Sequence, residues 1–396
     1  MNRNPGNRNM GFGIIGCGVI AAWHAEAIRQ CAGIRLAGAW DIRAEAAQDF
    51  CCHYAIQQYE TLEALLQDPH IQAVCVCTPS GRHAAMAMRA VESGKHVLLE
   101  KPMALSMEEA EALITAADER NVKLGVVSQW RFAPTTGLLK EAVENGRFGK
   151  ILIADLAMNY CRTAEYYVSK PWRGTYAMDG GILMNQGIHG IDILQYIVGP
   201  VRQVFGIARR LHHDIEVPDS VSAILEFACG AVGVVQATTA ACPGSPRVMR
   251  LYGTKGTMTL TEDAITSWMT GEDRDAVCEK PAIATCRPVA ADRDDESSHI
   301  TCRSEAGQDT EKMPVSGLQA VCPRENDSET VSSAQDPQIL PVWGHVRQIA
   351  DMASAIWEDR RPMIDGREGI KPLRIIAAIY ESASRQSPVC LPVDFL

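Results

Sequence analysis

Residues 12–21 are Phe12-Gly13-Ile14-Ile15-Gly16-Cys17-Gly18-Val19-Ile20-Ala21, an apolar run that ends in two closely spaced glycines. The run predicts a buried strand, and the residues after it have apolar positions at helical spacing. Glycines between a strand and a helix are typical of a turn that binds a dinucleotide. Gly16 permits the tight turn, Gly18 lets the backbone approach a pyrophosphate, and the small Ala21 allows close packing of the helix.

The same alternation continues to about residue 150. Short apolar runs alternate with helical periods, which predicts a parallel, doubly wound α/β sheet. The expected strands are residues 12–15, 36–40, 73–77, 96–99 and 123–127, and the expected helices are residues 21–31, 44–53, 83–93 and 107–120. We therefore predict an NAD(P)-binding Rossmann domain over residues 10–149.

Ligands of open parallel sheets bind at the carboxyl ends of the strands, so residues there are candidates for the cofactor site. Asp41 ends the second strand, where a carboxylate accepts hydrogen bonds from ribose hydroxyls and repels a 2'-phosphate. NAD is therefore favoured over NADP, although Arg43 could pair with such a phosphate if it is not simply solvated. The predicted cofactor-binding residues are Gly16, Gly18, Val19, Ile20, Asp41, Arg43, Thr78, Pro79, His83, Glu100 and Lys101.

The tripeptide Glu100-Lys101-Pro102 closes the apolar run of residues 95–99. A charged residue at such a strand end is well placed for chemistry, so Lys101 is expected to face the reactive ring of the cofactor. The alternative is a solvated lysine in a tight turn before proline. The tripeptide by itself does not decide between the two.

After residue 149 the pattern changes to consecutive strand-like runs, at residues 151–160, 201–211, 220–227, 231–239, 247–253 and 257–261. One helix, residues 181–198, interrupts them. Consecutive strands predict an open, mostly antiparallel sheet with one face covered, and hence an α+β second domain. Further helices are expected at residues 341–359 and 366–384, before a last short strand at 388–391.

Residues 271–336 differ in composition, with fifteen acidic and seven basic residues and no aromatic residue. Segments that bury little apolar surface stay unfolded, so we predict an acidic, disordered insertion here. The second domain then covers residues 150–270 and 337–396.

The helix at residues 181–198 has Asn185, His189 and Asp192 at positions i, i+4 and i+7, which share one face. One interpretation is a hydrogen-bonded structural network. The other is catalysis, because oxidation of an alcohol needs a base for the hydroxyl proton and histidine titrates in the useful range. A cation near the oxygen stabilises alkoxide character, so His189 and Lys101 are the candidates for these two roles.

Four motifs together point to one enzyme family: residues 16–21, Glu100-Lys101-Pro102, Gln129-Trp130-Arg131-Phe132 and residues 180–192. With them the chain resembles the Gfo/Idh/MocA family, named for glucose-fructose oxidoreductase and inositol dehydrogenase. The resemblance covers about residues 10–270 and 337–393. It implies a Rossmann domain, a second domain whose open sheet commonly forms subunit contacts, and oxidation or reduction of a sugar, cyclitol or related polyol with a nicotinamide cofactor.

By position, the resemblance implies that Lys101 contacts substrate and nicotinamide and that His189 is the acid/base catalyst. Asn185 stands where the inositol dehydrogenase form has aspartate, and asparagine can position a hydroxyl but cannot ionise. Asp179 stands where a third glycine is common. The predicted catalytic residues are Lys101, His189 and Asn185, and the predicted substrate-binding residues are Gln129, Arg131, Tyr166, Trp172, Arg173, Asn185 and His189.

The composition limits the partners. A formal charge of −10 and a pI near 5.5 argue against nucleic acid and anionic membranes. The chain has no apolar run of spanning length and no export signal near its start, and its fourteen cysteines do not follow metal-ligand spacing. We expect a cytoplasmic protein without a metal, which binds a small polyol or sugar and forms a dimer or tetramer through the C-terminal sheet.

These observations predict an NAD-dependent oxidoreductase that oxidises a secondary hydroxyl of a sugar, nucleotide sugar or cyclitol by hydride transfer to nicotinamide. One alternative is an NADPH-dependent keto-sugar or aldose reductase, against which Asp41 argues. The other is a regulatory protein that binds NAD without turnover, for which the acidic insertion is the supporting feature.

Overall fold

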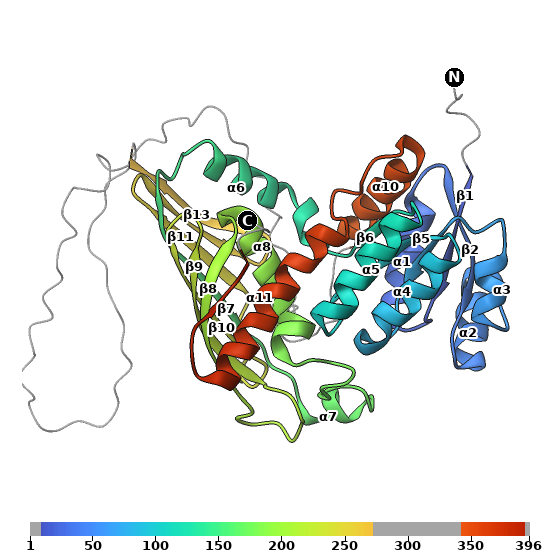
Figure 1. Cartoon of the computed structure of the whole chain (residues 1–396), viewed down its shortest axis with the longest axis horizontal. Coiled ribbons are helices and arrows are strands. Elements are labelled where there is room, and N and C mark those ends of the chain that lie inside the picture. The colour runs from blue at the N-terminus through green and yellow to red at the C-terminus, as the bar shows by residue number, and fades with distance from the viewer. Residues whose placement is uncertain (1–8, 272–341, 393–396) are drawn as a thin grey trace, which may run out of the picture. The chain divides into compact units, whose positions relative to one another are not determined.

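The computed structural model describes residues 9–271 and 342–392, which belong to one compact unit (Figure 1). The predicted acidic insertion lies outside the described residues, apart from Gly271 at its start. Among the described helices, none is both long and apolar enough to cross a membrane.

The N-terminal part forms a six-stranded sheet in which every pairing is parallel, with the order β3-β2-β1-β4-β5-β6. The strands are β1 (Met10–Ile15), β2 (Ile34–Trp40), β3 (Gln57–Gln58), β4 (Ala73–Val76), β5 (His96–Leu99) and β6 (Leu124–Val126). The helices between them are α1 (Val19–Gln30), α2 (Ala44–Tyr54), α3 (Leu62–Gln67), α4 (His83–Glu92) and α5 (Met107–Glu119). The predicted doubly wound α/β fold is confirmed.

Both faces of this sheet are buried, because alternate strand residues enter two different cores. Val74 and Val76 pack with α3, α4 and α5, whereas Cys75 and Cys77 pack with α1 and α2. The two buried thiols therefore act as small apolar side chains.

The second sheet has eight strands in the order β13-β12-β11-β7-β10-β9-β8-β14, and only the pair β7 and β10 is parallel. The strands are β7 (Ile151–Asn159), β8 (Val201–Arg209), β9 (Ser220–Phe227), β10 (Val232–Thr238), β11 (Val248–Gly253), β12 (Gly256–Thr261), β13 (Ala264–Thr270) and β14 (Val389–Cys390). The predicted open, mostly antiparallel sheet is confirmed.

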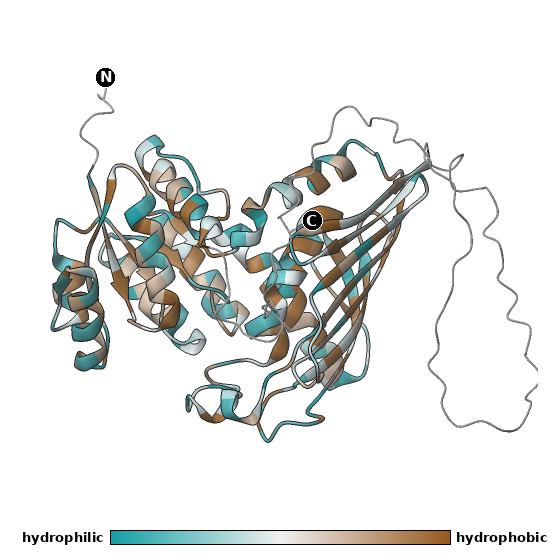
Figure 2. Cartoon of the chain, turned by 180° about the vertical axis from the view of Figure 1, so that it is seen from behind, coloured by the Kyte–Doolittle hydropathy of each residue, from teal (hydrophilic) through white to brown (hydrophobic). Residues whose placement is uncertain are grey.

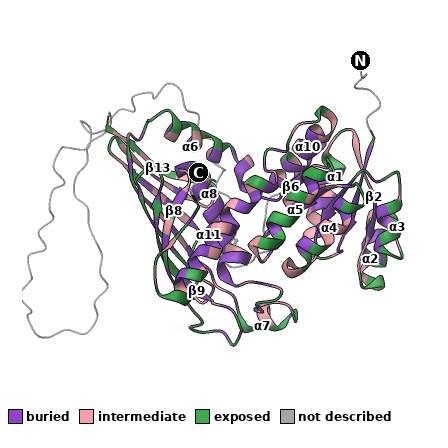
Figure 3. Ribbon diagram, viewed as in Figure 1, coloured by how far each residue is buried: buried purple, intermediate pink, exposed green. Residues whose placement is uncertain are grey.

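Only one face of this second sheet is covered by the described residues. Buried and exposed residues alternate along β8, β9 and β10 (Figure 3). Helices α8 (Ile188–Val198) and α11 (Gly366–Arg385) pack on the covered face (Figure 1). The other face carries exposed apolar side chains. Hydrophobic and hydrophilic residues are mixed along these strands (Figure 2).

The structure adds elements that the sequence patterns did not predict. They are the short β3, α3, α6 (Pro134–Glu144), α7 (Ala164–Val168), the edge strand β13 and the 3-10 turn Gln129–Phe132. The predicted helix at residues 181–198 begins as a π-helical turn, Leu183–Gly187, before α8.

Helix α10 (Trp343–Glu358) differs most from its predicted place. We assigned residues 337–396 to the second domain, but α10 packs against α1. Ile349 and Met352 enter the core that contains β1 and α1, and the Cys31 thiol donates to the Val346 carbonyl at 3.4 Å. The chain thus returns to the first sheet before α11 reaches the second.

Candidate active site

The glycine-rich turn between β1 and α1 leaves room for a phosphate group. Gly16 has a φ of +94°, and a Cβ there would lie 3.0 Å from the Cys77 carbonyl, so only glycine fits without strain. Around Gly18, by contrast, no described heavy atom lies within 4 Å of an added Cβ. The first turn of α1 has no acidic residue and no side-chain cap, and although the Ala21 N–H donates to the Gly18 carbonyl, the turn remains suited to bind an anion.

Asp41 contacts this turn directly. Its carboxylate accepts the Cys17 N–H at 2.8 Å and the Arg43 N–H at 2.8 Å. The Arg43 guanidinium lies 3.6 Å from the same carboxylate, and its side chain is exposed. Asp41 therefore holds the turn and keeps lone pairs for a ligand hydroxyl, as the prediction of a ribose contact requires.

Thr78 and His83 lie where β4 ends. The Thr78 hydroxyl is buried and has no hydrogen-bond partner among the described residues, so it can bond a ligand there. Each ring nitrogen of His83 lies 2.7 Å from a backbone carbonyl, Nε2 from that of Thr78 and Nδ1 from that of Pro102. His83 thereby ties the end of β4 to the turn after β5, and its cofactor contact stays a prediction.

Lys101 reaches from this turn to the second domain. Its ammonium donates to the backbone carbonyl of Asn185 at 2.6 Å. Burial lowers the pKa of Lys101, while the carboxylates of Glu100 and Asp179 raise it. Lys101 and His189 line one small pocket, together with Val127 and Ser128. The structure thus brings together the lysine, the histidine and the asparagine that were predicted to be catalytic.

His189 is set up as a neutral imidazole. Burial holds its pKa well below the usual range, and the nearby charges of Lys101 and Arg247 act in the same direction. A neutral ring can accept a proton, which is what a general base must do. No sequence pattern singled out Arg247, which lies directly before β11 and whose charge acts on His189 from there.

Asn185 is oriented by a buried carboxylate. Its Nδ2 donates to Asp179, whose other oxygen accepts the Gly174 N–H at 2.7 Å. Asp179 is buried, and burial raises the pKa of its carboxyl group. The departure from glycine at position 179 thus supplies the partner of Asn185.

The predicted substrate-side residues form an aromatic and cationic cluster around α7. The Arg173 guanidinium lies 3.9 Å from the centre of the Tyr166 ring and 5.6 Å from that of Trp172. The Arg162 guanidinium lies 5.6 Å from the Tyr166 ring, and Gln186 donates to the Tyr166 hydroxyl at 3.3 Å. Tyr166 is therefore tied to the turn that carries Asn185.

Gln129 and Arg131, also predicted to bind substrate, are both buried. Arg131 donates from Nε and Nη2 to Asp192 at 2.8 and 2.5 Å, and from Nη1 to Glu368 at 2.7 Å. These contacts favour a structural role for Arg131, and they engage both carboxylate oxygens of Asp192, which lines the pocket beside His189. Gln129 keeps its Oε1 without a partner among the described residues, and its substrate contact stays a prediction.

Two family models match this chain. Residues 10–128 match an oxidoreductase family with an NAD-binding Rossmann fold, and residues 137–259 match the GFO/IDH/MocA C-terminal domain. The uncharacterized oxidoreductase YrbE of Bacillus subtilis is 30% identical over 258 residues, which cover 62% of this chain and 71% of that protein. The myo-inositol 2-dehydrogenase of Thermotoga maritima is 28% identical over 254 residues, which cover 62% of this chain and 74% of that protein.

A solved structure resembles the whole chain. The WlbA dehydrogenase of Bordetella pertussis, in complex with NADH and UDP-GlcNAcA, has a TM-score of 0.77 and 28% identity and covers 98% of this chain and 100% of its own. The predicted NAD cofactor is thereby confirmed, and the open turn before α1, the uncapped helix N-terminus and the Thr78 hydroxyl fit it. From these matches and this site, the chain belongs to the Gfo/Idh/MocA family and is an NAD-dependent oxidoreductase.

Proposed function

We propose that this protein oxidises a secondary hydroxyl of a sugar, nucleotide sugar or cyclitol. The observation that carries the proposal is the meeting of Lys101, Asn185 and His189 at the carboxyl end of β5, beside a turn that fits NAD. When bound, NAD supplies the acceptor for the hydride from the substrate carbon. The relatives support the substrate class, since one is named for inositol and one solved neighbour holds a nucleotide sugar.

Each catalytic side chain has one task in this proposal. His189 takes the hydroxyl proton on a ring nitrogen, because burial and two nearby cations keep the ring neutral. Lys101 uses one N–H to bind the Asn185 carbonyl and keeps two to stabilise the substrate oxygen as charge develops. Asn185 orients a second hydroxyl with its amide oxygen, because its NH₂ group is held by Asp179.

The test is a screen of inositols, pyranosides and nucleotide sugars with NAD, followed by absorbance of the reduced nicotinamide. On a confirmed substrate, His189→Gln and Lys101→Met are each expected to lower kcat by about 10²-fold or more, the usual contribution of an acid/base or oxygen-stabilising group. His53→Gln on α2 and Lys140→Met on α6 are matched controls, because they make the same changes of residue type and neither residue lines the pocket. Full turnover in both site variants would contradict the proposal.

We also propose that the exposed face of the second sheet forms subunit contacts. Ile207 on β8 is 50% exposed, Ile224 on β9 54% and Val234 on β10 42%, and monomeric proteins rarely leave so many neighbouring large apolar side chains in water. Ile224→Glu is expected to shift the protein towards monomer in light scattering coupled to gel filtration. Met363→Glu, at a similarly exposed methionine outside the sheets, is the control. A wild-type monomer would contradict this part of the proposal.

A cytoplasmic location is part of the same proposal. All ten cysteines among the described residues are free thiols, which a reducing compartment favours.

A further inference from the structure

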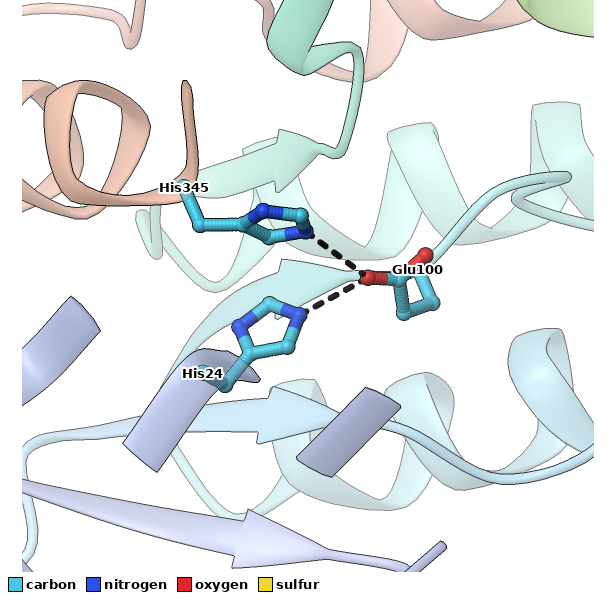
Figure 4. A group of neighbouring side chains, drawn as sticks. All are labelled: His24, Glu100 and His345. Carbon is cyan, nitrogen blue, oxygen red and sulfur yellow. Dashed lines mark hydrogen bonds and ion pairs between the residues drawn. The ribbon is translucent and has the colours of Figure 1, made fainter. Parts of the chain in front are cut away.

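His24, Glu100 and His345 form a buried cluster (Figure 4), and its glutamate precedes Lys101 in the chain. His24 comes from α1, Glu100 from the turn after β5 and His345 from the first turn of α10. Their exposed fractions are 0%, 4% and 2%. His24 Nε2 lies 2.8 Å from Glu100 Oε1, and His345 Nε2 lies 3.9 Å from the same oxygen.

The two oxygens of Glu100 have different partners. Oε1 faces the two imidazoles, whereas Oε2 accepts the backbone N–H of Lys101 at 3.2 Å. The carboxylate therefore connects the histidines to the backbone of the lysine. A movement of Glu100 would move the backbone from which the Lys101 ammonium reaches the Asn185 carbonyl.

The charge of Glu100 depends on these histidines. Burial alone would raise the pKa of its carboxyl group, but the hydrogen bond from His24 and the nearby ring of His345 hold that pKa well below the usual range. The ionised carboxylate in turn raises the pKa of Lys101, which burial lowers. The other titratable groups that sense Glu100 are Cys75, Cys77, His83 and His189.

We propose that His24 and His345 are positioning residues that act through Glu100, fixing the backbone of Lys101 and keeping its ammonium charged for the substrate oxygen. The inference rests on the proposed function for the role of Lys101. It assigns a task to two histidines that touch neither substrate nor cofactor in that proposal.

The same residue types can bind a metal, and the geometry argues against it. A metal-bound histidine usually donates its second ring N–H to a carboxylate or carbonyl. Here Nδ1 of both His24 and His345 has no partner in the described part of the chain. The short contact of 2.8 Å between His24 and Glu100 is instead that of a hydrogen bond.

The first experiment measures Lys101 without using activity. The full-length protein is acetylated with trace acetic anhydride across a pH series, and the Lys101 and Lys123 peptides are quantified by mass spectrometry. Combined, His24→Leu and His345→Leu leave Glu100 Oε1 without either imidazole, so the buried carboxylate takes up a proton and its charge no longer supports the Lys101 ammonium. We expect Lys101 to react about tenfold faster at pH 7.5, the equivalent of one unit of pKa, and Lys123 to react at an unchanged rate.

Conservative variants keep the test decisive. Glutamine can place an N–H near the position of Nε2, so His24→Gln and His345→Gln are expected to restore most of the wild-type labelling rate. Glu100→Gln is expected to match the leucine variants, and it tests the same link if those variants fail to fold. His53→Leu, at an exposed histidine on α2, should change nothing.

Three outcomes would overturn the inference. One is an unchanged Lys101 labelling rate in folded leucine and Glu100→Gln variants. Another is glutamine variants that behave like the leucine variants. The third is a stoichiometric transition metal in the purified protein that is lost with either histidine. If the wild-type protein has no turnover on any substrate, the proposed function fails, but the labelling result still decides the link between the cluster and Lys101.

Once a substrate is known, kinetics separate positioning from general loss of structure. The histidine variants are expected to lower kcat tenfold or more, while the NAD dissociation constant from tryptophan fluorescence changes less than threefold. Equal losses in kcat and in NAD affinity would indicate a distorted Rossmann domain and would count against a specific action on Lys101.

Discussion

Replacement of Asp192 by alanine tests whether the network around Arg131 is structural. The Arg131 and Asp192 side chains are 1% and 3% exposed, and they form two charged hydrogen bonds. Asp192 also accepts the Ser128 hydroxyl. Among the described residues, Asp192→Ala leaves the buried guanidinium with one carboxylate partner, Glu368, whose side chain is 30% exposed. Removing one partner of a buried ion pair destabilises a protein by about 3–5 kcal/mol.

Thermal unfolding measures this loss. At about 2 °C per kcal/mol, the low end for larger domains, Tm should fall by at least about 6 °C. The control is Asp118→Ala, which removes the ion pair between Asp118 and Arg367. Their side chains are 49% and 46% exposed. Such exposed pairs contribute at most about 1 kcal/mol.

A double variant distinguishes an uncompensated charge from a general packing defect. Arg131→Met with Asp192→Leu removes both charges and keeps most of the volume, so it should recover most of the lost Tm. If Asp192→Ala leaves Tm within about 1 °C of wild type and abolishes turnover, Asp192 is catalytic and our structural interpretation is wrong.

Two further predictions concern the cofactor turn and the base. Asp41→Ser removes the carboxylate at the turn and should reduce the preference for NAD over NADP by about 10–100-fold, the range for a charged hydrogen bond. Asp49→Ser is the control. Unchanged dissociation constants for both cofactors would refute the role of Asp41. Because the folded-state pKa of His189 is depressed, its basic form persists as pH falls, so kcat/KM should stay constant through pH 6.5. An acid limb centred at pH 6.5 that disappears in His189→Gln would show an unperturbed histidine.

Local patterns were sufficient for most elements of the fold. The glycine turn, the alternation of strands with helices and the later run of strands each depend on neighbours within a few residues, and the structure confirms them. Elements with weak patterns were missed: β13 has mostly half-buried or exposed residues, and α7 has only five residues. Neither has a buried stripe that periodicity could reveal.

The contacts between distant residues could not be predicted in this way. His24 and Glu100 are 76 positions apart, and Arg131 and Asp192 are 61 positions apart. His24 occupies an ordinary buried position on α1, and only the third dimension shows that a carboxylate lies beside it. For the same reason a conspicuous arginine in a family motif was interpreted as a substrate contact, although each of its donor groups bonds a buried or half-buried carboxylate.

Asn185 shows how the two kinds of information combine. Its sequence position implied the loss of an ionisable group from the site, since asparagine replaces an aspartate there. The structure shows that Asp179, which precedes the π-helical turn Leu183–Gly187, supplies a carboxylate that contacts the Asn185 amide. That contact fixes Nδ2 towards Asp179 and leaves Oδ1 as an acceptor for a substrate hydroxyl, while the second Nδ2 hydrogen remains a donor. The pair therefore suits a polyol substrate, which presents a second hydroxyl to Asn185 beside the hydroxyl that is oxidised at Lys101 and His189.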